Sequence, residues 1–169
     1  MKQVFYLFGQ LSDTDVDWLA TSGVKQTIDA GQVLIREGSA VGAVYIVLRG
    51  KLTVTTNSRG EVNILTWGEI AGEMSFVDGA PATANLIASE PTEVLKVAHR
   101  KLEQRLKTEA GFAGRFYRAT SLALSDRLRE QMHKSTEDFA DELSPELLDT
   151  VHTAGTRFDR LLKVLQPSH

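Results

Sequence analysis

The sequence predicts an α+β fold that is mainly β, an antiparallel double-stranded β-helix (jelly roll) with a short N-terminal helix and C-terminal helices. Three observations support this fold class. Residues 24–98 alternate short β-prone runs with turn residues, residues 12–23 have the pattern of a capped helix, and helical spacing of apolar residues begins after His99.

The expected N-terminal helix begins after Ser12. Serine is a preferred N-cap residue, and the aspartates at three of the next five positions suit the positive end of a helix dipole. Val16 and Leu19 lie three residues apart and can share a buried face. Gly23 is a favourable residue for the end of this helix.

The strand region consists of short runs rich in Val, Ile, Leu, Thr and Tyr. Residues 57–60 lie between two such runs and predict a hairpin loop in which Gly60 supplies a positive φ. Several short strands at this spacing indicate an antiparallel sandwich or roll. The expected strands lie within residues 33–38, 44–50, 51–56, 62–67, 82–88 and 92–98.

Two helices are expected in the C-terminal part. The first, over about residues 112–133, is apolar over a wide arc and must therefore face either the roll or a second subunit. Its stripe consists of Phe112, Phe116, Ala119 and Ala123, with Leu124, Leu128 and Met132 beside it. Residues 135–143 are polar and acidic, which predicts a linker.

The second helix is expected to begin at Ser144-Pro145, an N-cap followed by proline at the first helical position. Its short heptad stripe can dock on its own domain or pair with a partner helix. The stripe consists of Leu148, Val151, Gly155, Phe158, Leu162 and Leu165. We expect one domain over residues 1–134, with residues 135–169 forming an acidic linker and a C-terminal helix, not an independent domain.

Composition excludes several classes of protein. The 169 residues include no cysteine, so disulfides, thiolate metal sites and cysteine nucleophiles are excluded. The N-terminal residues turn polar too soon for a signal peptide, and there is no run of about 18 apolar residues for a membrane helix. We therefore expect a cytoplasmic protein with no membrane partner.

The net charge of −3 is unevenly distributed, with an excess of basic residues in 99–134 and of acidic residues in 135–169. A basic helical segment can form a nucleic-acid patch. Charges that offset one another, or that lie on solvated faces, are the simpler interpretation because a surface that binds duplex DNA should be basic. DNA is therefore not an expected partner.

The segment from Gly68 to Ala84 interrupts the strand pattern. It contains Gly72-Glu73-Met74-Ser75, a turn at Asp78-Gly79 and a proline before the next strand. A short helical turn here would direct free N–H groups into the roll, where they could hold an anion. Glu73 would be carried inside beside that turn, and a buried carboxylate needs hydrogen-bond donors, which ligand hydroxyls could supply.

In these features the sequence resembles the cyclic-nucleotide-binding domain family, which includes the catabolite activator protein and the regulatory subunits of protein kinase A. The resemblance covers about residues 5–130. It is carried by Leu7-Phe8-Gly9-x-Leu11-Ser12, Glu37-Gly38, Tyr45-x-Val47-x-x-Gly50, Gly72-Glu73-Met74-Ser75 and the long helix that includes Arg115 to Arg129.

The resemblance implies a role for each residue of the 72–75 segment and makes cAMP or cGMP a candidate ligand. Gly72 would let the backbone approach the ligand, and Glu73 would accept the ribose 2′-hydroxyl. Backbone N–H groups around Met74 and Ser75 would meet the cyclic phosphate. The candidate ligand-binding residues are Gly72, Glu73, Met74, Ser75, Ala82, Thr83 and Ala84.

One departure from the family pattern lies at Ala82. The family has an arginine there that pairs with the phosphate, and Thr83 and Ala84 follow it in this chain. Losing one partner of a buried charge pair costs about 2–5 kcal/mol, which is about thirty-fold to a few thousand-fold in affinity. The sequence therefore predicts that nucleotide binding is weakened or lost, unless Arg36, Arg49 or Arg59 reaches the site.

No enzyme is expected. All four histidines lie outside residues 24–98, whereas a metal-dependent jelly-roll enzyme needs two or three histidines on its strands. No nucleophile–base pair is apparent either. Met74, Phe76 and Tyr45 are interpreted as core residues, and the arginines of the 115–129 helix as a solvated face.

Two functions from different classes remain. The first is a small-ligand sensor or regulatory domain. The alternative is a ligand-free interaction module that forms a homodimer or docks a protein partner through helices 112–133 and 145–165. A DNA-binding regulator is less favoured, because the related transcription factors carry a further domain of about 60 residues and only 35 acidic-rich residues follow position 134.

Overall fold

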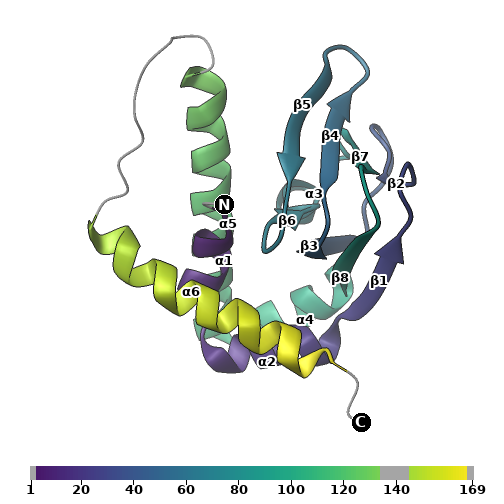
Figure 1. Ribbon diagram of the computed structural model, residues 1–169. Helices are drawn as coiled ribbons and strands as arrows, with labels where there is room; N and C mark the ends of the chain where they lie inside the picture. The colour runs from purple at the N-terminus through teal and green to yellow at the C-terminus, as the bar shows by residue number, and fades with distance from the viewer. Residues whose placement is uncertain (1–2, 134–144, 167–169) are drawn as a thin grey trace.

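The computed structural model describes residues 3–133 and 145–166 and contains two four-stranded antiparallel sheets (Figure 1). The strand order is β1-β8-β3-β6 in one sheet and β2-β7-β4-β5 in the other, which confirms the expected jelly roll. The strands are β1 Val24–Ile28, β2 Val33–Ile35, β3 Ala43–Arg49, β4 Leu52–Thr56, β5 Gly60–Leu65, β6 Ile70–Ala71, β7 Asn85–Ala88 and β8 Thr92–Ala98.

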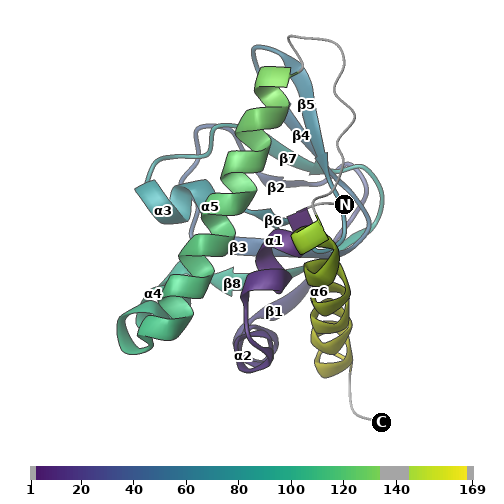
Figure 2. The same cartoon turned by 90° about the vertical axis from the view of Figure 1, so that its left-hand side faces the viewer.

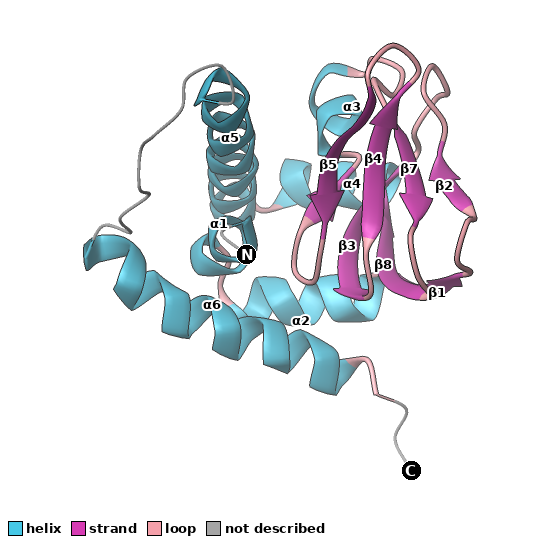
Figure 3. Ribbon diagram, turned by 45° about the horizontal axis from the view of Figure 1, so that its top comes forward, coloured by secondary structure: helices cyan, strands magenta, loops and turns pink. Residues whose placement is uncertain are grey.

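Helices flank the roll, and one short helix lies within the strand region. They are α1 Gln3–Gln10, α2 Asp13–Ser22, α3 Glu73–Asp78, α4 His99–Thr108, α5 Ala110–His133 and α6 Pro145–Val164. Figures 1 and 2 show α5 standing beside the roll, while α6 crosses α1 and α2 at one end of the molecule. Figure 3 shows the two sheets from a third direction, with most helices outside them. Among the described residues, no helix is long and apolar enough to cross a membrane.

Two hydrophobic cores meet at β3. Val44, Ile46 and Leu48 belong to a core shared with the helices, whereas Tyr45 and Val47 belong to the core inside the roll. Successive side chains of a strand point to opposite faces, so both faces of β3 are covered and its first six residues are buried. This confirms the expectation that Tyr45 is a core residue.

The N-cap predicted at Ser12 is confirmed and forms a capping box with Asp15. Asp15 is only 1% exposed, and it also accepts hydrogen bonds from Arg115 Nε at 2.6 Å and Arg105 Nη2 at 3.3 Å. One carboxylate thus joins α2 to α4 and α5. Arg115 remains 39% exposed, as the solvated-face interpretation of the 115–129 arginines expects, although it also pairs with this buried carboxylate.

The expected C-terminal helix is confirmed as α6, and its apolar face docks on its own chain. Ala154, Phe158 and Leu161 are buried in the same core as Leu7 and Phe8. Phe158 packs edge-on against Phe8 at a ring-centroid distance of 5.3 Å. The predicted N-cap Ser144 and the linker 135–143 lie outside the described residues.

Four elements escape the sequence prediction. Helix α4 lies in the region of helical spacing after His99 but was not predicted as a separate helix. The other three are β1, α1 and β6. In β1 only Ile28 is buried, so no apolar alternation marks this strand, which pairs with β8 over five residues. Most of α1 is a run of residues 4–8 that are all apolar. The alternation of apolar and polar residues that marks a helix is therefore missing. Strand β6 is two residues long and pairs with β3 inside the segment interpreted as a turn.

Candidate functional site

The predicted short helical turn is confirmed as α3. Gly72 precedes it at φ 80°, a left-handed conformation that favours glycine, and a Cβ at this position would lie 2.7 Å from the carbonyl oxygen of Ala43. The resemblance assigns Gly72 to close approach by the ligand. The structure adds a second reason for glycine, because β3 passes so close to position 72 that no Cβ fits between them.

The helix α3 divides its side chains between the interior and the surface. Glu73 is 2% exposed and Ser75 is 9% exposed. Phe76 packs edge-on against the rings of His99 and Phe116, which holds α3 against the helical core. Met74 is 45% exposed, so the expectation that it packs in the core is wrong. Met74 lines the cavity with an exposed side chain, whereas Glu73 and Ser75 on the same helix are buried.

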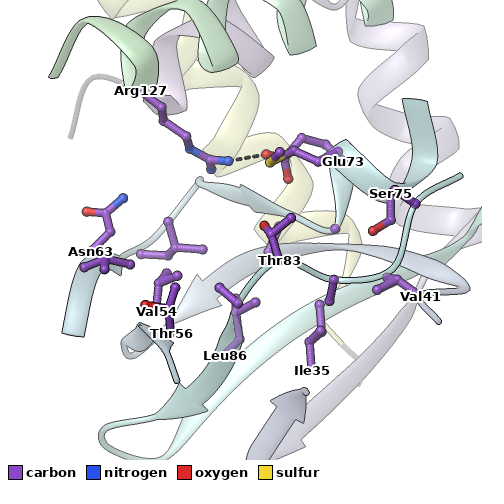
Figure 4. Close-up of a pocket in the computed structure, with 18 of the residues that line it drawn as sticks. Ile35, Val41, Val54, Thr56, Asn63, Glu73, Ser75, Thr83, Leu86 and Arg127 are labelled. Atoms are coloured by element: carbon purple, nitrogen blue, oxygen red, sulfur yellow. Dashed lines mark hydrogen bonds and ion pairs between the residues drawn. The ribbon is translucent and has the colours of Figure 1, made fainter. Parts of the chain in front are cut away.

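Glu73 has a charged partner that the sequence did not indicate. Arg127 on α5 forms an ion pair through Nη1 with Glu73 Oε1, and its Nη2 donates to the carbonyl oxygen of Ile70 at 2.7 Å (Figure 4). The arginine side chain is 18% exposed. The solvated-face interpretation is therefore wrong for Arg127. A buried carboxylate needs compensation, and here a guanidinium from the chain supplies it.

The residues Ala82, Thr83 and Ala84 lie in a loop before β7, not in a strand as predicted. The loop is held by backbone bonds to the β2–β3 connection. The Ala82 N–H donates to Ser39 O at 2.9 Å, and the Ala82 carbonyl accepts from the Gly38 N–H at 2.7 Å. Both bonds are made by the backbone, while the Ala82 side chain packs against the core inside the roll and lines the cavity.

All seven candidate residues line one cavity of about 240 Å³ between the roll, α3 and α5. Figure 4 shows Ile35, Val54 and Leu86 on the strands and Arg127 reaching from α5. The described lining residues include one basic side chain, Arg127, and neither Arg36, Arg49 nor Arg59 is among them. None of the three arginines considered from the sequence therefore lines the cavity, and the basic side chain that does is paired with Glu73.

No group of three or more metal-binding side chains occurs in the part of the chain that the structure describes. The site therefore consists of a largely apolar cavity, hydroxyl groups from Ser75, Thr83 and Thr56, and the Glu73–Arg127 pair at the edge that α5 closes. Such an arrangement can enclose a small molecule and can link its binding to the position of a helix.

Two antiparallel sheets, a short helix before β7 and a long helix over the cavity define a regulatory signalling fold of the jelly-roll type. The family model described as cyclic nucleotide-binding domain matches residues 25–109. The chain belongs to the cyclic nucleotide-binding domain family.

Comparison with individual proteins agrees with this family. The chain is 28% identical over 99 residues to a cGMP-dependent protein kinase of Eimeria tenella. The aligned region covers 59% of this chain and 10% of the kinase. It is 28% identical over 122 residues to a cAMP-dependent protein kinase regulatory subunit of Pyricularia oryzae, covering 65% of this chain and 31% of that protein. The chain thus spans a minor part of each of these relatives.

Among solved structures, a cyclic nucleotide-binding domain from Methylobacillus flagellatus superimposes with a TM-score of 0.69 and 24% identity. The match covers 79% of this chain and 78% of that one. At this level of identity the similarity establishes the shared fold.

Proposed function

We propose that this domain is a small-ligand sensor in which occupation of the cavity is transmitted to α5. The observation that carries the proposal is the contact between Glu73 and Arg127, because it joins the cavity to α5. A ligand that hydrogen-bonds Glu73 competes with Arg127 for one carboxylate. Differential affinity for the two arrangements of α5 then shifts their populations.

Cyclic nucleotides are the first ligands to test, because the curated relatives are named as cGMP- and cAMP-dependent proteins. We propose that their affinity for this chain is weakened. Ala82 lines the cavity where the family resemblance expects an arginine, and the described lining contains no cation besides the paired Arg127. A phosphate would therefore enter without a charge partner, which is costly in a low-dielectric site.

Isothermal titration of the native chain and of Ala82→Arg with cAMP and cGMP tests the weakened affinity. The restored cation should tighten binding by about thirty-fold or more, since a buried charge pair is worth about 2–5 kcal/mol. Thr27→Arg is the matched control, because it adds the same charge on an exposed position of β1 outside the cavity. Equal affinity in the native and Ala82→Arg proteins would contradict the assignment of position 82.

Transmission to α5 is tested separately with a fluorine label. The chain has no cysteine, so Ser125→Cys places one label on the exposed side of α5, and Ser58→Cys places one on the β4–β5 turn as a control. With cAMP at saturation in Ala82→Arg, the resonance at position 125 should shift or split while that at position 58 stays unchanged. An unchanged resonance at position 125 despite calorimetric binding would contradict the sensor proposal.

A second candidate function is an interaction module that acts through α5. Its support is the exposure of Tyr117, Leu128 and Met132, at 45%, 58% and 66%. Phe158, Leu162 and Leu165 of the α6 stripe pack in the core that α1 and α2 share, so we place this surface on α5 alone. Light scattering distinguishes the candidates. A concentration-dependent dimer that Leu128→Glu abolishes favours this module, whereas a monomer at high concentration counts against self-association.

A further inference from the structure

The side chains that form the interior of the cavity are apolar. Ile35, Val54, Leu65 and Leu86 come from β2, β4, β5 and β7, and Val41 from the β2–β3 connection. Uncharged polar groups lie beside them, among them the hydroxyls of Ser75 and Thr83 and the amide of Asn63. This composition is that of a site in which apolar surface supplies the affinity and a few polar atoms supply orientation.

The charged lining residues bring an excess of negative charge. The carboxylates are Glu73, Asp78 and Glu130, and Arg127 is the basic residue among the described lining. Arg127 is matched by Glu73 and by the carbonyl oxygen of Ile70, whereas Asp78 and Glu130 are exposed. An anion entering the cavity therefore meets an already neutralised cation and two carboxylates that face solvent near it.

We propose that the cavity is built for an uncharged, mainly apolar small molecule and discriminates against anions, cyclic nucleotides included. This inference rests on the proposed sensor function and names its ligand class. The volume of about 240 Å³ lies just below the range of about 300–1,000 Å³ typical of sites for drug-sized ligands. It therefore fits a small ring compound that donates one hydrogen bond to Glu73, in competition with Arg127, and makes another at Ser75, Thr83 or Asn63.

The test uses pairs of probes that share shape and differ in charge. Benzamide with benzoate, and indole-3-acetamide with indole-3-acetate, are titrated into the native chain and followed by the amide resonances of Ala82, Thr83 and Ala84. At least one amide should bind saturably, with its carboxylate at least ten-fold weaker. If neither amide binds at 5 mM, the proposal is overturned. A carboxylate that binds as tightly as its amide would overturn it too.

Two variants connect the preference to this cavity. Ala82→Arg should reduce the amide-to-carboxylate preference at least ten-fold, whereas the control Thr27→Arg should leave it unchanged. Glu130→Gln, at an exposed position of α5 that does not endanger folding, should strengthen carboxylate binding by about two- to five-fold. The proposal is overturned if Thr27→Arg changes the amide-to-carboxylate preference as much as Ala82→Arg does. It is also overturned if neither Ala82→Arg nor Glu130→Gln changes that preference, because the preference then does not arise in this cavity.

The outcomes separate this inference from the proposed function. If cAMP or cGMP binds the native chain more tightly than every amide, the ligand class is wrong and the sensor proposal stands. If an amide binds in the cavity while the label at Ser125→Cys on α5 remains unchanged, the ligand class stands and the sensor proposal is wrong.

Discussion

At the scale of single residues, the Asp15 carboxylate accepts hydrogen bonds from Ser12, Arg105 and Arg115. Burial alone would raise its pKa, but the hydrogen bonds from Arg115 and Ser12 outweigh this effect and lower the pKa from its ordinary 3.8 to about 2. The native state therefore favours the ionised form more strongly than the unfolded chain does.

This shift predicts acid sensitivity. As pH falls, the unfolded state takes up its proton near 3.8 while native Asp15 stays ionised until about 2, so unfolding is favoured across that interval. The carboxylate should contribute about 2 kcal/mol at pH 5 that is mostly lost by about pH 2. Urea melts of the native chain and of Asp15→Asn should show a shallower pH dependence for the variant. Thr27→Ala, at an exposed residue of β1 that does not ionise, serves as control and should retain the native slope.

The Glu73–Arg127 pair makes a second prediction at this scale. Replacing Arg127 by Gln leaves a 2% exposed carboxylate without its cation, which should destabilise the fold by about 3 kcal/mol. Adding Glu73→Gln should recover part of that loss, because the uncompensated buried charge is removed. Denaturation midpoints of both single variants and the double variant give the coupling energy. A double variant less stable than Arg127→Gln would contradict the assigned pairing.

The residues of the site differ in how far the sequence could predict them. Gly72, Glu73 and Ser75 follow one another, so a local motif is sufficient to identify them. Arg127 lies 54 positions from Glu73, and no spacing rule within α5 distinguishes it from the exposed Arg129. Its role depends on how α5 lies across the cavity, which is a tertiary property that the sequence motif does not encode.

At the scale of elements, the approach of α6 to α1 depends on a glycine. A Cβ added to Gly9 would overlap the γ-methyl group of Thr150, whereas one added to Gly114 on α5 would meet nothing within 4 Å. Both glycines lie within helices, so alanine at either position gains helix propensity. The two positions therefore differ in packing alone.

We expect opposite effects from the same substitution at these positions. Gly9→Ala should destabilise the protein by about 1–3 kcal/mol, because overpacking forces α6 to move. Gly114→Ala should stabilise it by about 0.5–1 kcal/mol through the lower entropy cost of ordering alanine. Thermal melts of both variants test this difference. Equal stabilisation by both would mean that α6 does not pack closely on α1 in solution.

The sequence predicted elements well where one face is buried and poorly where burial is absent or complete. Helix α2 and the helices after the roll show amphipathic spacing, and the strands of the roll carry β-prone runs between turns. Strand β1 contributes almost nothing to the core, and α1 contains a run without alternation. Their formation depends on pairing with β8 and on packing against α5 and α6, which are contacts between distant segments.

At the scale of the whole molecule, we propose that α6 and the roll unfold as one unit. Phe158 is 4% exposed and lies in the core that α1, α2, α5 and the outer face of β3 share. Removing its ring should cost about 3–5 kcal/mol. Phe158→Ala should therefore lower the urea midpoints of helical circular dichroism and of β8 hydrogen exchange together. Loss of helical signal before β8 loses protection would instead mean that α6 is a separate, weaker unit.

The positions of the two tryptophans have a practical consequence. Trp67 packs against Phe158 of α6 at a ring-centroid distance of 5.5 Å, and Trp18 packs against Phe112 with the Arg105 guanidinium over its ring. Each indole thus occupies a different junction. Emission spectra of Trp18→Phe and Trp67→Phe can consequently follow the two junctions independently, without any added dye.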